Sequence, residues 1–523
     1  MADTATHQEV PSDVRPNGLI GLAAAAVALG VAQLSAVPFG PHADSRTAIG
    51  SAVIDLTPGP VKEWAIQLFG TSDKLFLTVV VLVGIGVIAA LTAQYERRRR
   101  PVGSIAIVVA GVLGSAAVLS RAGATAVDVV PTLLGTVCGV LVLRLLVSGR
   151  ITNAVPPEDA SKTDSPDRGR RLSLVTIGFI GAGAMAGVAG AVLNRLNSSV
   201  AQDRTAFALP TARTATPVVA PPSVQPPGVA LPPFITPNAD FYRIDTALSV
   251  PQLSRANWRL KIHGMVDREV TFTFDDLQRF EVVEEIVTLT CVSNPVGGDL
   301  ISNAKWTGYR VRDLLAGAGI HPDADMVMST SIDGFTAGTP VEALTDQRNS
   351  LLAIGMNDAP LPTEHGYPAR LVVPGLYGYV SATKWVVDLE LTRFDRAKAY
   401  WTDLGWSARG PIKTESKIEI PRSGADIPRG PTTFGGVAWA QQRGIKAVEV
   451  RIDDGPWQPA QLGASYSNDT WRLWSFTWQA DATGPHSITV RATDGTGAVQ
   501  TADQADVIPD GATGWHTVSF SVE

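Results

Sequence analysis

Five long apolar stretches in the N-terminal part of the chain limit its possible folds more than any other feature. They lie near residues 18–38, 75–94, 102–121, 126–147 and 172–193. About 20 consecutive apolar residues are enough for a helix to cross the hydrocarbon core of a bilayer. A single stretch of this kind could be a buried helix of a soluble protein. Five in succession predict an N-terminal five-helix transmembrane domain over residues 1–195.

Basic residues indicate how these helices are oriented. Arg97 to Arg100 follow the second stretch. Between the fourth and fifth stretches lie Arg150, Lys162, Arg168, Arg170 and Arg171. Because Lys and Arg collect in cytoplasmic loops, we expect both groups in the cytoplasm. Five spans then place everything after residue 193 outside, so we expect a multi-pass plasma-membrane protein with an extracytoplasmic C-terminal part.

The residues that precede the fifth stretch form an unusual pattern. Arg170 and Arg171 precede a modest, Gly-rich apolar run, which resembles a twin-arginine export signal placed inside the chain. That route exports folded proteins, and it would suit a domain that receives a complex cofactor in the cytoplasm. Two alternatives remain open: the arginines anchor a helix end, or Gly183 and Gly187 form a small-residue packing face.

Cysteine usage and charge exclude several classes of protein. The chain has only two cysteines, Cys138 inside an apolar stretch and Cys291 far from it, so we expect neither a structural disulfide nor a zinc site. The net charge of -6 comes without a basic patch, and we therefore expect no nucleic-acid partner.

The pattern changes three times after the apolar stretches. Residues 196–237 are rich in Pro, Ala, Thr and Val, which predicts an extended, semi-rigid linker. Residues 238–412 mix alternating strand patterns with a short helix predicted over 311–318, as in an α+β domain. Residues 413–523 contain short strands separated by Asp-Gly turns, which predict an immunoglobulin-like β-sandwich.

Cys291 is the side chain with the clearest capacity for a chemical role. It follows the strand-like run 286–290 and precedes a turn at 293–295. A thiol at a strand end can bind a soft metal as a thiolate. A buried small apolar residue is the alternative.

Motifs around this cysteine favour the metal site. In order they are FYR at 241–243, TCVSN at 290–294, MNDAPLP at 356–362, HGYPARLVVPG at 365–375 and KW at 384–385. The series resembles the sulfite oxidase family of molybdopterin-dependent oxidoreductases. WRLW at 471–474 and GWH at 514–516 are similar to that family's immunoglobulin-like dimerisation domain. The resemblance implies a membrane-anchored bacterial member, of an actinobacterial type.

What the resemblance implies can be assigned residue by residue. Cys291 would supply the protein thiolate to molybdenum and, with Arg243, act in catalysis. The implied cofactor-binding residues are Tyr242, Arg243, Cys291, Ser331, His365, Arg370, Thr383 and Lys384. Among these, the basic side chains suit the pterin phosphate, because Arg binds two oxygens at once and Lys adds a point charge.

Departures from the family pattern concern the substrate. Pro295 and Val296 stand where two arginines are expected, Trp406 stands where a catalytic tyrosine is expected, and an arginine expected shortly before Trp515 is missing. Only Arg243 remains of that positive pocket. Because sulfite is a dianion, we expect another substrate to be preferred.

The expected function is therefore a membrane-anchored, extracytoplasmic molybdopterin enzyme for two-electron oxygen-atom transfer. Alternatives are an S-oxide or N-oxide reductase of the same fold and a non-catalytic relic that only binds. Tyr400, Trp401 and Trp406 would shape an apolar substrate mouth or belong to the core.

Expected partners are a small-molecule substrate, a separate electron carrier, membrane lipid, and a second copy through the C-terminal domain. The apolar stretches contain no histidine, so we expect no haem. They also carry almost no charge, which argues against a transporter.

Overall fold

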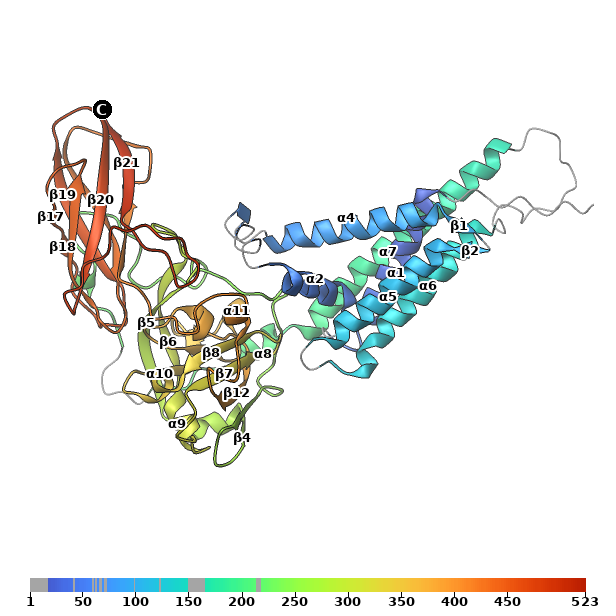
Figure 1. The fold of residues 1–523 in the computed structure, drawn as a ribbon, viewed down its shortest axis with the longest axis horizontal. Helices are drawn as coiled ribbons and strands as arrows, with labels where there is room; N and C mark the ends of the chain where they lie inside the picture. The colour runs from blue at the N-terminus through green and yellow to red at the C-terminus, as the bar shows by residue number, and fades with distance from the viewer. Residues whose placement is uncertain are drawn as a thin grey trace, which may run out of the picture. The chain divides into compact units, whose positions relative to one another are not determined.

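The computed structural model describes residues 17–523 apart from 41–42, 59–60, 62–63, 65–67, 70–72, 98, 122–123, 149–164 and 213–217. Arg98, Arg150 and Lys162, which contribute to the predicted orientation, lie outside the described residues. The chain forms two compact units (Figure 1). Unit 1 consists of Met1–Ser199 with Thr246–Ser249, and unit 2 of Val200–Asp245 with Val250–Glu523.

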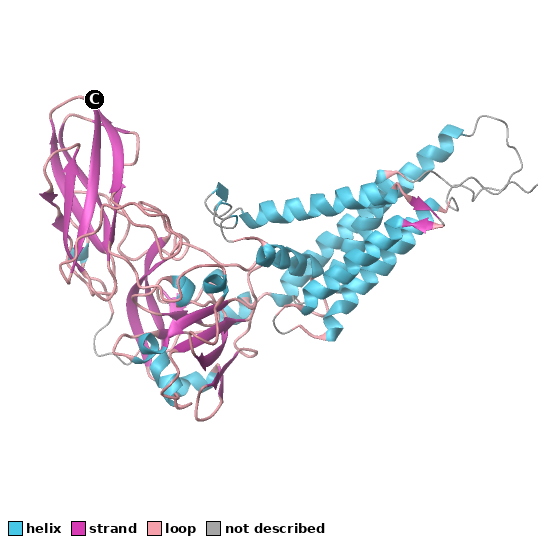
Figure 2. Ribbon diagram, in the orientation of Figure 1, coloured by secondary structure: helices cyan, strands magenta, loops and turns pink. Residues whose placement is uncertain are grey.

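Helices dominate unit 1 (Figure 2). They are α1 (Gly18–Ser35), α2 (Ser45–Leu56), α4 (Asp73–Ala93), α5 (Val102–Leu119), η3 (Ala126–Val129), α6 (Val130–Val147) and α7 (Ser165–Ser198), with a two-stranded ladder of β1 (Glu96–Arg97) and β2 (Arg100–Pro101). Within the described residues, five helical segments are long and apolar enough to cross a membrane: Gly18–Ser35, Leu75–Ala93, Val102–Leu119, Ala126–Val147 and Arg170–Ala206. They match the five predicted stretches.

Glycine brings α1 and α7 close together. A Cβ added to Gly183 of α7 would lie 2.4 Å from the carbonyl carbon of Ala26, and one added to Gly30 would lie 2.1 Å from the carbonyl oxygen of Gly183. Only residues without a Cβ permit such an approach of two backbones. Gly181, two residues away, has nothing within 4 Å of its Cβ position. Gly183 therefore belongs to a helix-packing face, as one of the sequence alternatives proposed.

The first part of unit 2 has the predicted α+β character. One sheet contains β10 (Ala359–Pro360), β9 (Leu351–Met356), β6 (Ile301–Arg310) and β5 (Val282–Thr290), with β11 (Arg370–Val372) also paired to β9. A second sheet contains β4 (Val270–Thr273), β3 (Arg259–Gly264), β12 (Val386–Thr392), β7 (Met326–Ser331) and β8 (Thr336–Pro340). The helical segments are α8 (Ala201–Ala206), η4 (Pro222–Val224), η5 (Asp275–Arg279), α9 (Val311–Ala316), α10 (Val341–Thr345), η6 (Thr363–His365), η7 (Gly378–Val380) and α11 (Tyr400–Asp403).

The C-terminal part of unit 2 is a β-sandwich, which confirms the predicted immunoglobulin-like fold. One sheet has the order β13 (Glu415–Ile420), β15 (Gly430–Trp439), β19 (Arg472–Ala480) and β18 (Gln461–Leu462). The other has β14 (Ala425–Ile427), β21 (His516–Val522), β20 (Gly484–Asp494), β16 (Ile445–Ile452) and β17 (Gln458–Pro459). Alternate apolar residues of the two sheets, such as Val450, Trp474 and Ile488, fill the space between them.

Described residues of the segment predicted as an extended, semi-rigid linker pack against the rest of unit 2. Val224, Leu231 and Phe234 are buried in the main apolar cluster of unit 2, and Arg204 donates to the carbonyl oxygen of Leu361 at 2.7 Å. The described part of this proline-rich segment forms α8 and η4 but no strand, and apolar side chains between its prolines are nevertheless buried.

Candidate functional site

Cys291 lies where β5 leaves its sheet. The last five residues of the strand are buried, and their side chains enter apolar clusters on both faces of the strand. The Cys291 amide donates to the carbonyl oxygen of Leu300 at 2.9 Å, and the Asn294 amide donates to the carbonyl oxygen of Cys291 at 3.2 Å. The cysteine is half-buried and outside any disulfide. A rigid strand therefore holds a thiol at the start of a closed turn.

The same turn contains an unused hydrogen-bond donor. Asn294 is buried; its Oδ1 accepts from the amide of Leu300 at 2.9 Å, but its Nδ2 has no acceptor among the described residues. A buried donor without an acceptor costs about 1–3 kcal/mol. Such a donor next to Cys291 fits a bound group that is rich in acceptors, as a pterin cofactor is.

Two tyrosines lie close to Cys291. Burial, followed by the negative charge of Cys291, raises the pKa of Tyr242 far above its ordinary value. Burial also raises the pKa of Tyr377, with smaller contributions from Glu415 and Cys291. Gly378, which follows Tyr377, lies between Tyr242 and the residue before Cys291. A Cβ added to Gly378 would be 3.9 Å from the Tyr242 hydroxyl and 3.9 Å from the carbonyl oxygen of Thr290. Both phenols therefore remain protonated at neutral pH beside the thiol.

One buried carboxylate holds two cations of the predicted site. Asp245 Oδ2 accepts from Lys384 Nζ at 2.8 Å and from Arg243 Nε at 3.0 Å, and only 4% of the Asp245 side chain is exposed. Burial lowers the pKa of Lys384 to about 8, although Asp245 opposes the shift. Lys384 also donates to the carbonyl oxygen of Glu364 at 3.2 Å.

Arg370 is a third cation, and it has no carboxylate partner among the described residues. Its guanidinium donates to the carbonyl oxygens of His365, Leu371 and Ala382 at 3.2–3.3 Å and lies 5.1 Å from the ring centroid of Trp306. Burial lowers its pKa to about 10, so the group remains charged at neutral pH. A buried cation without a counterion favours the binding of an anion.

Gly366 allows this cation cluster to form. Its φ of +112° lies in the left-handed region, and a Cβ there would be 3.0 Å from Arg370 Cβ and 3.2 Å from Lys384 Cα. Arg243, Arg370 and Lys384 carry three positive charges against the single negative charge of Asp245. A net charge of +2 matches a dianionic phosphate.

His365 enters the cluster as a neutral ring. Burial, followed by the positive charges of Arg370 and Lys384, lowers its pKa to about 3. Its Nε2 lies 3.3 Å from the carbonyl oxygen of Asn238. Asn357 holds Asn238 in place, because Asn357 Nδ2 donates to Asn238 Oδ1 at 2.7 Å. Asn357 itself has a φ of 51° in the tight turn between β9 and β10, a conformation that asparagine tolerates well.

Ser331 and Thr383 lie near the cation cluster, but they differ in whether their hydroxyls are engaged inside the sheet. Ser331 ends β7, and its register partner is Val386, two residues after Lys384. The Thr383 hydroxyl is buried and lies 2.7 Å from the Ser329 hydroxyl, to which it is hydrogen-bonded. Ser331 therefore lies beside the strand that follows Lys384, whereas the Thr383 side chain is engaged inside the sheet.

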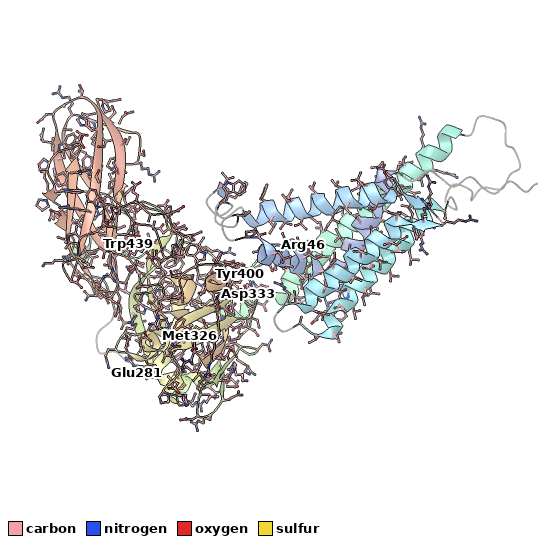
Figure 3. The ribbon with its side chains drawn as sticks, viewed as in Figure 1. Arg46, Glu281, Met326, Asp333, Tyr400 and Trp439 are labelled. Atoms are coloured by element: carbon pink, nitrogen blue, oxygen red, sulfur yellow. The ribbon has the colours of Figure 1, made fainter. Side chains whose placement is uncertain are left out.

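The aromatic group that sequence reasoning left undecided divides between core and surface. Trp406 is buried in the main apolar cluster, with its ring centroid 5.8 Å from Tyr379 and 6.1 Å from Trp401. Tyr400 on α11 is only half-buried. It lies near the loop that carries Asp333 (Figure 3), and its ring is 5.9 Å from that of Phe335.

Acidic residues, rather than arginines, lie near Tyr377. Glu415 at the start of β13 is buried, and burial raises its pKa to about 8, so it is largely protonated at neutral pH. Lys413 pairs with Asp510 at 2.9 Å. Both acidic groups raise the pKa of Tyr377. Near Tyr377, the charge of Lys413 is therefore balanced by Asp510, and Glu415 is largely neutral.

Sequence reasoning missed Asp245, Tyr377 and Glu415. Asp245 lies two residues after Arg243, and an acid close to a predicted cation cluster could have been considered as its counterion. Tyr377 stands just after the proline-glycine motif that ends at 375, so the motif itself pointed nearby. Nothing in the local sequence marks Glu415, because it reaches this region from the β-sandwich.

Comparisons with known proteins agree with this architecture. The oxidoreductase molybdopterin binding domain matches residues 247–401, and the bacterial Ig domain matches residues 416–490. The uncharacterized oxidoreductase YuiH of Bacillus subtilis is 32% identical over 153 residues, which cover 29% of this chain and 74% of YuiH.

Sulfite oxidase of Gallus gallus is 28% identical and covers 51% of this chain and 68% of its own length. Mitochondrial sulfite oxidase of Mus musculus is 29% identical and covers 48% of this chain. The match spans 54% of the mouse protein, so the chain corresponds to about half the length of that relative.

Proposed function

Because the chain belongs to the sulfite oxidase family of molybdopterin-dependent oxidoreductases, we propose that it transfers an oxygen atom and two electrons to or from a small molecule other than sulfite. The observation that carries the proposal is the surrounding of Cys291: a thiol on a rigid strand end, an unused donor on Asn294, and a neighbouring cluster with a net charge of +2.

Each side chain has a role in this proposal. Molybdenum on the pterin supplies the oxygen-transfer and two-electron chemistry. Cys291 Sγ binds the metal as a thiolate. Arg370 and Lys384 hold the pterin phosphate through charge-assisted hydrogen bonds, and His365 contributes a neutral ring at the same place. Ser331 and Thr383 support the strands that flank the cofactor.

Arg243 and Tyr242 act on the reacting side. Arg243 lies at the edge of the cluster with 36% of its side chain exposed, so it can meet a substrate as well as Asp245. The Tyr242 hydroxyl stays protonated and can donate a hydrogen bond, or a proton, beside the thiol.

Charge is the argument against sulfite. Pro295 is exposed and Val296 is half-buried in the turn after Cys291, and neither can attract a dianion. Lys413 is neutralised by Asp510. A neutral or weakly polar substrate is therefore proposed, since Arg370 and Lys384 are assigned to the pterin phosphate and Arg243 is the remaining cation of the described cluster.

Reduction of a neutral S-oxide or N-oxide is the second candidate. Such a reduction consumes two electrons and two protons and releases the reduced compound and water. The protonated phenols of Tyr242 and Tyr377 favour it, because they can supply hydrogen-bond donors to the oxygen that leaves.

The cellular setting is also a proposal. The five apolar helical segments support anchoring in the plasma membrane, with the catalytic part on the extracytoplasmic side and export through Arg170 and Arg171. We retain 238–412 as the molybdopterin-binding domain and 413–523 as the immunoglobulin-like domain that pairs two copies. A separate carrier would exchange electrons with the cofactor.

Purified full-length protein tests the proposal. We expect close to one molybdenum per chain, turnover of S-oxides or N-oxides with a reducing dye or of a neutral oxygen acceptor with an oxidising dye, and weak activity with sulfite. Cys291→Ser should fold with an unchanged circular dichroism spectrum but lose turnover. Wild-type protein that folds without molybdenum would support the non-catalytic relic, and full activity in Cys291→Ser would exclude the proposed ligand.

A further inference from the structure

A groove in unit 1 is lined by three helices and has no role in the proposed chemistry. Its walls come from α1, α2, α4 and from Leu248 and Ser249, and it encloses a space of about 80 Å³ that continues into an open mouth. This is less than the volume of about 300–1,000 Å³ that encloses a whole small-molecule ligand. The groove therefore receives one end of a ligand and leaves the rest outside.

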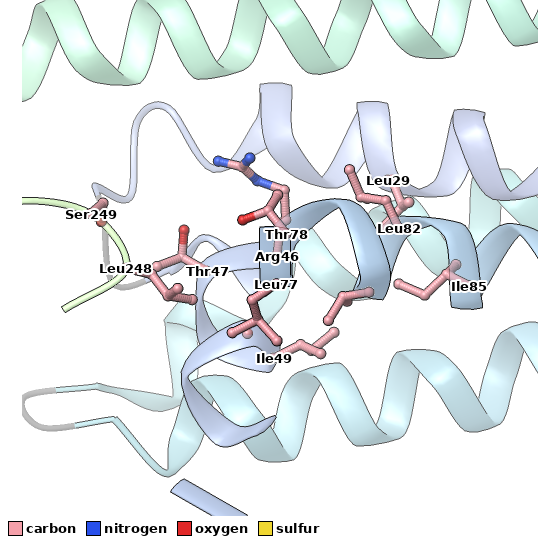
Figure 4. Close-up of a pocket in the computed structure, with 12 residues that line it drawn as sticks. Leu29, Arg46, Thr47, Ile49, Leu77, Thr78, Leu82, Ile85, Leu248 and Ser249 are labelled. Atoms are coloured by element: carbon pink, nitrogen blue, oxygen red, sulfur yellow. The ribbon is translucent and has the colours of Figure 1, made fainter. Parts of the chain in front are cut away.

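The groove has a polar end and an apolar end (Figure 4). Arg46, Thr47 and Ser249 lie toward one end, and Leu29, Leu82 and Ile85 lie toward the other. A ligand that fits both ends carries a polar head on an apolar body.

Arg46 supplies the donors of the polar end. It is 43% exposed, and its side chain makes no hydrogen bond within the described residues; the nearest carboxylate oxygen, Asp44 Oδ2, is 3.7 Å away. A guanidinium has five N–H donors. Asp44 itself is buried and satisfied, because it accepts from Gln33 Nε2 at 3.1 Å and from the Thr47 hydroxyl at 2.9 Å.

The Arg46–Asp44 pair decides the charge of the ligand. Because one positive and one negative charge lie at the same end, the polar end has no net charge. A lipid phosphate at Arg46 would also lie near the Asp44 carboxylate and be repelled by it. A neutral head with carbonyl acceptors matches this end better than an anionic one.

We infer that this groove binds the head of a membrane quinone, which serves as the two-electron partner of the molybdenum centre. The inference rests on the proposed function, because that reaction must exchange two electrons with a carrier. A quinone takes up two electrons and two protons to become a quinol, and a quinol returns them in the opposite direction. The apolar helices contain no histidine for an imidazole-ligated haem, so another carrier is needed.

The chain also connects the groove with the cofactor cluster. Leu248 and Ser249 line the groove, and they follow Asp245, the carboxylate of Lys384 and Arg243, by three and four residues.

The test uses full-length, molybdenum-loaded protein in nanodiscs of phosphatidylcholine. The protein is reduced with dithionite, desalted without oxygen, and mixed with decylubiquinone or with ferricyanide. Both oxidants should reoxidise the wild-type protein. Leu82→Trp, which fills the apolar end, and Arg46→Gln, which removes the donors, should each slow reoxidation by decylubiquinone by about tenfold or more, or about 1.4 kcal/mol. Ferricyanide rates should not change.

Leu91→Trp is the matched control, because Leu91 is on the same helix, is 54% exposed, and does not line the groove. It should leave both rates unchanged. Decylubiquinone should also raise the melting temperature of wild-type and Leu91→Trp protein but not of Leu82→Trp, a readout that needs no turnover.

Two results would overturn the inference alone: an unchanged decylubiquinone rate in Leu82→Trp, or a groove that retains anionic phospholipid on purification and does not respond to decylubiquinone. Wild-type protein that even ferricyanide cannot reoxidise would instead contradict the proposed function on which the inference depends.

Discussion

Individual side chains in the cofactor cluster differ most in how their charges are compensated. Lys384 and Arg243 share Asp245, whereas the described contacts of Arg370 are with carbonyl oxygens and the face of Trp306. The cluster is therefore incomplete without an anion, and the uncompensated charge is concentrated on Arg370. This asymmetry can be measured.

The first prediction compares Arg370→Met with Lys384→Met. Both should lower the molybdenum content of purified protein, because each removes a cation from the phosphate site. In cofactor-free protein, however, Lys384→Met should be the more destabilising, by about 1–3 kcal/mol, since it breaks a buried ion pair, while Arg370→Met removes a buried charge that had no counterion. Urea denaturation measures the difference, and the reverse order would contradict the charge assignment.

The second prediction concerns pH. Burial raises the pKa of Glu415 from 4.5 to about 8. Between these values the folded protein keeps a proton that the unfolded chain releases, so the stability of the soluble part should fall as pH rises from about 5 to about 8. Glu415→Gln, which imitates the protonated form, should flatten this part of the profile in thermal melts. A wild-type melting temperature that is constant over this window would show that Glu415 is ionised in the folded protein.

Strands and helices determine how firmly the site is held. The β-sandwich braces β5 directly: Thr288 Oγ1 accepts from the amide of Trp471 at 2.8 Å and donates to Asn303 Oδ1 at 2.9 Å, and Gln441 Nε2 donates to the Thr288 carbonyl oxygen at 3.1 Å. The strand that precedes Cys291 is thus held in place by the C-terminal domain.

The third prediction concerns the glycine contact of α1 and α7. Gly183→Leu should destabilise the helical unit by about 1–3 kcal/mol through overpacking against the backbone of Ala26. Gly181→Leu is the control, because its Cβ position is open. Thermal unfolding in detergent distinguishes the two variants, and equal effects would show that the contact does not form.

For the chain as a whole, the central question is how a cofactor-bearing part reaches its compartment. Unit 1 contains the five apolar helical segments, and unit 2 contains both the molybdopterin-binding domain and the β-sandwich. The proposed extracytoplasmic location of unit 2 would require a route that exports folded proteins, and Arg170 and Arg171 begin the last apolar segment.

The fourth prediction follows from this arrangement. Replacing Arg170 and Arg171 by lysine keeps the charge but removes the proposed export signal, so the catalytic part should become inaccessible to protease added to spheroplasts. Arg97→Lys with Arg100→Lys is the control and should leave accessibility unchanged. Protease cleavage of the catalytic part in the Arg170/Arg171 variant would favour the simpler view that these arginines only anchor a helix end.

Local pattern was sufficient for many of the helices and strands, whereas the site residues were predicted from the resemblance to a family. Five apolar stretches became five helical segments, because twenty apolar residues in a row have few other solutions. Alternating residues became strands such as β3 and β16, since a period of two places every second side chain on one face. The strand and turn around Cys291 were predicted locally, whereas its role as a metal ligand came from the resemblance to a family and stays a prediction.

The folded chain alone determined which charges compensate one another. Asp245 and Lys384 are 139 positions apart, and Glu415 acts on Tyr377 from a different domain. The buried linker residue Phe234 likewise owes its place to partners far along the chain, such as Trp471, whose Nε1 donates to its carbonyl oxygen. The physical reason is that electrostatic and packing energies depend on separations of a few ångströms in space, which the spacing of residues along the chain does not specify.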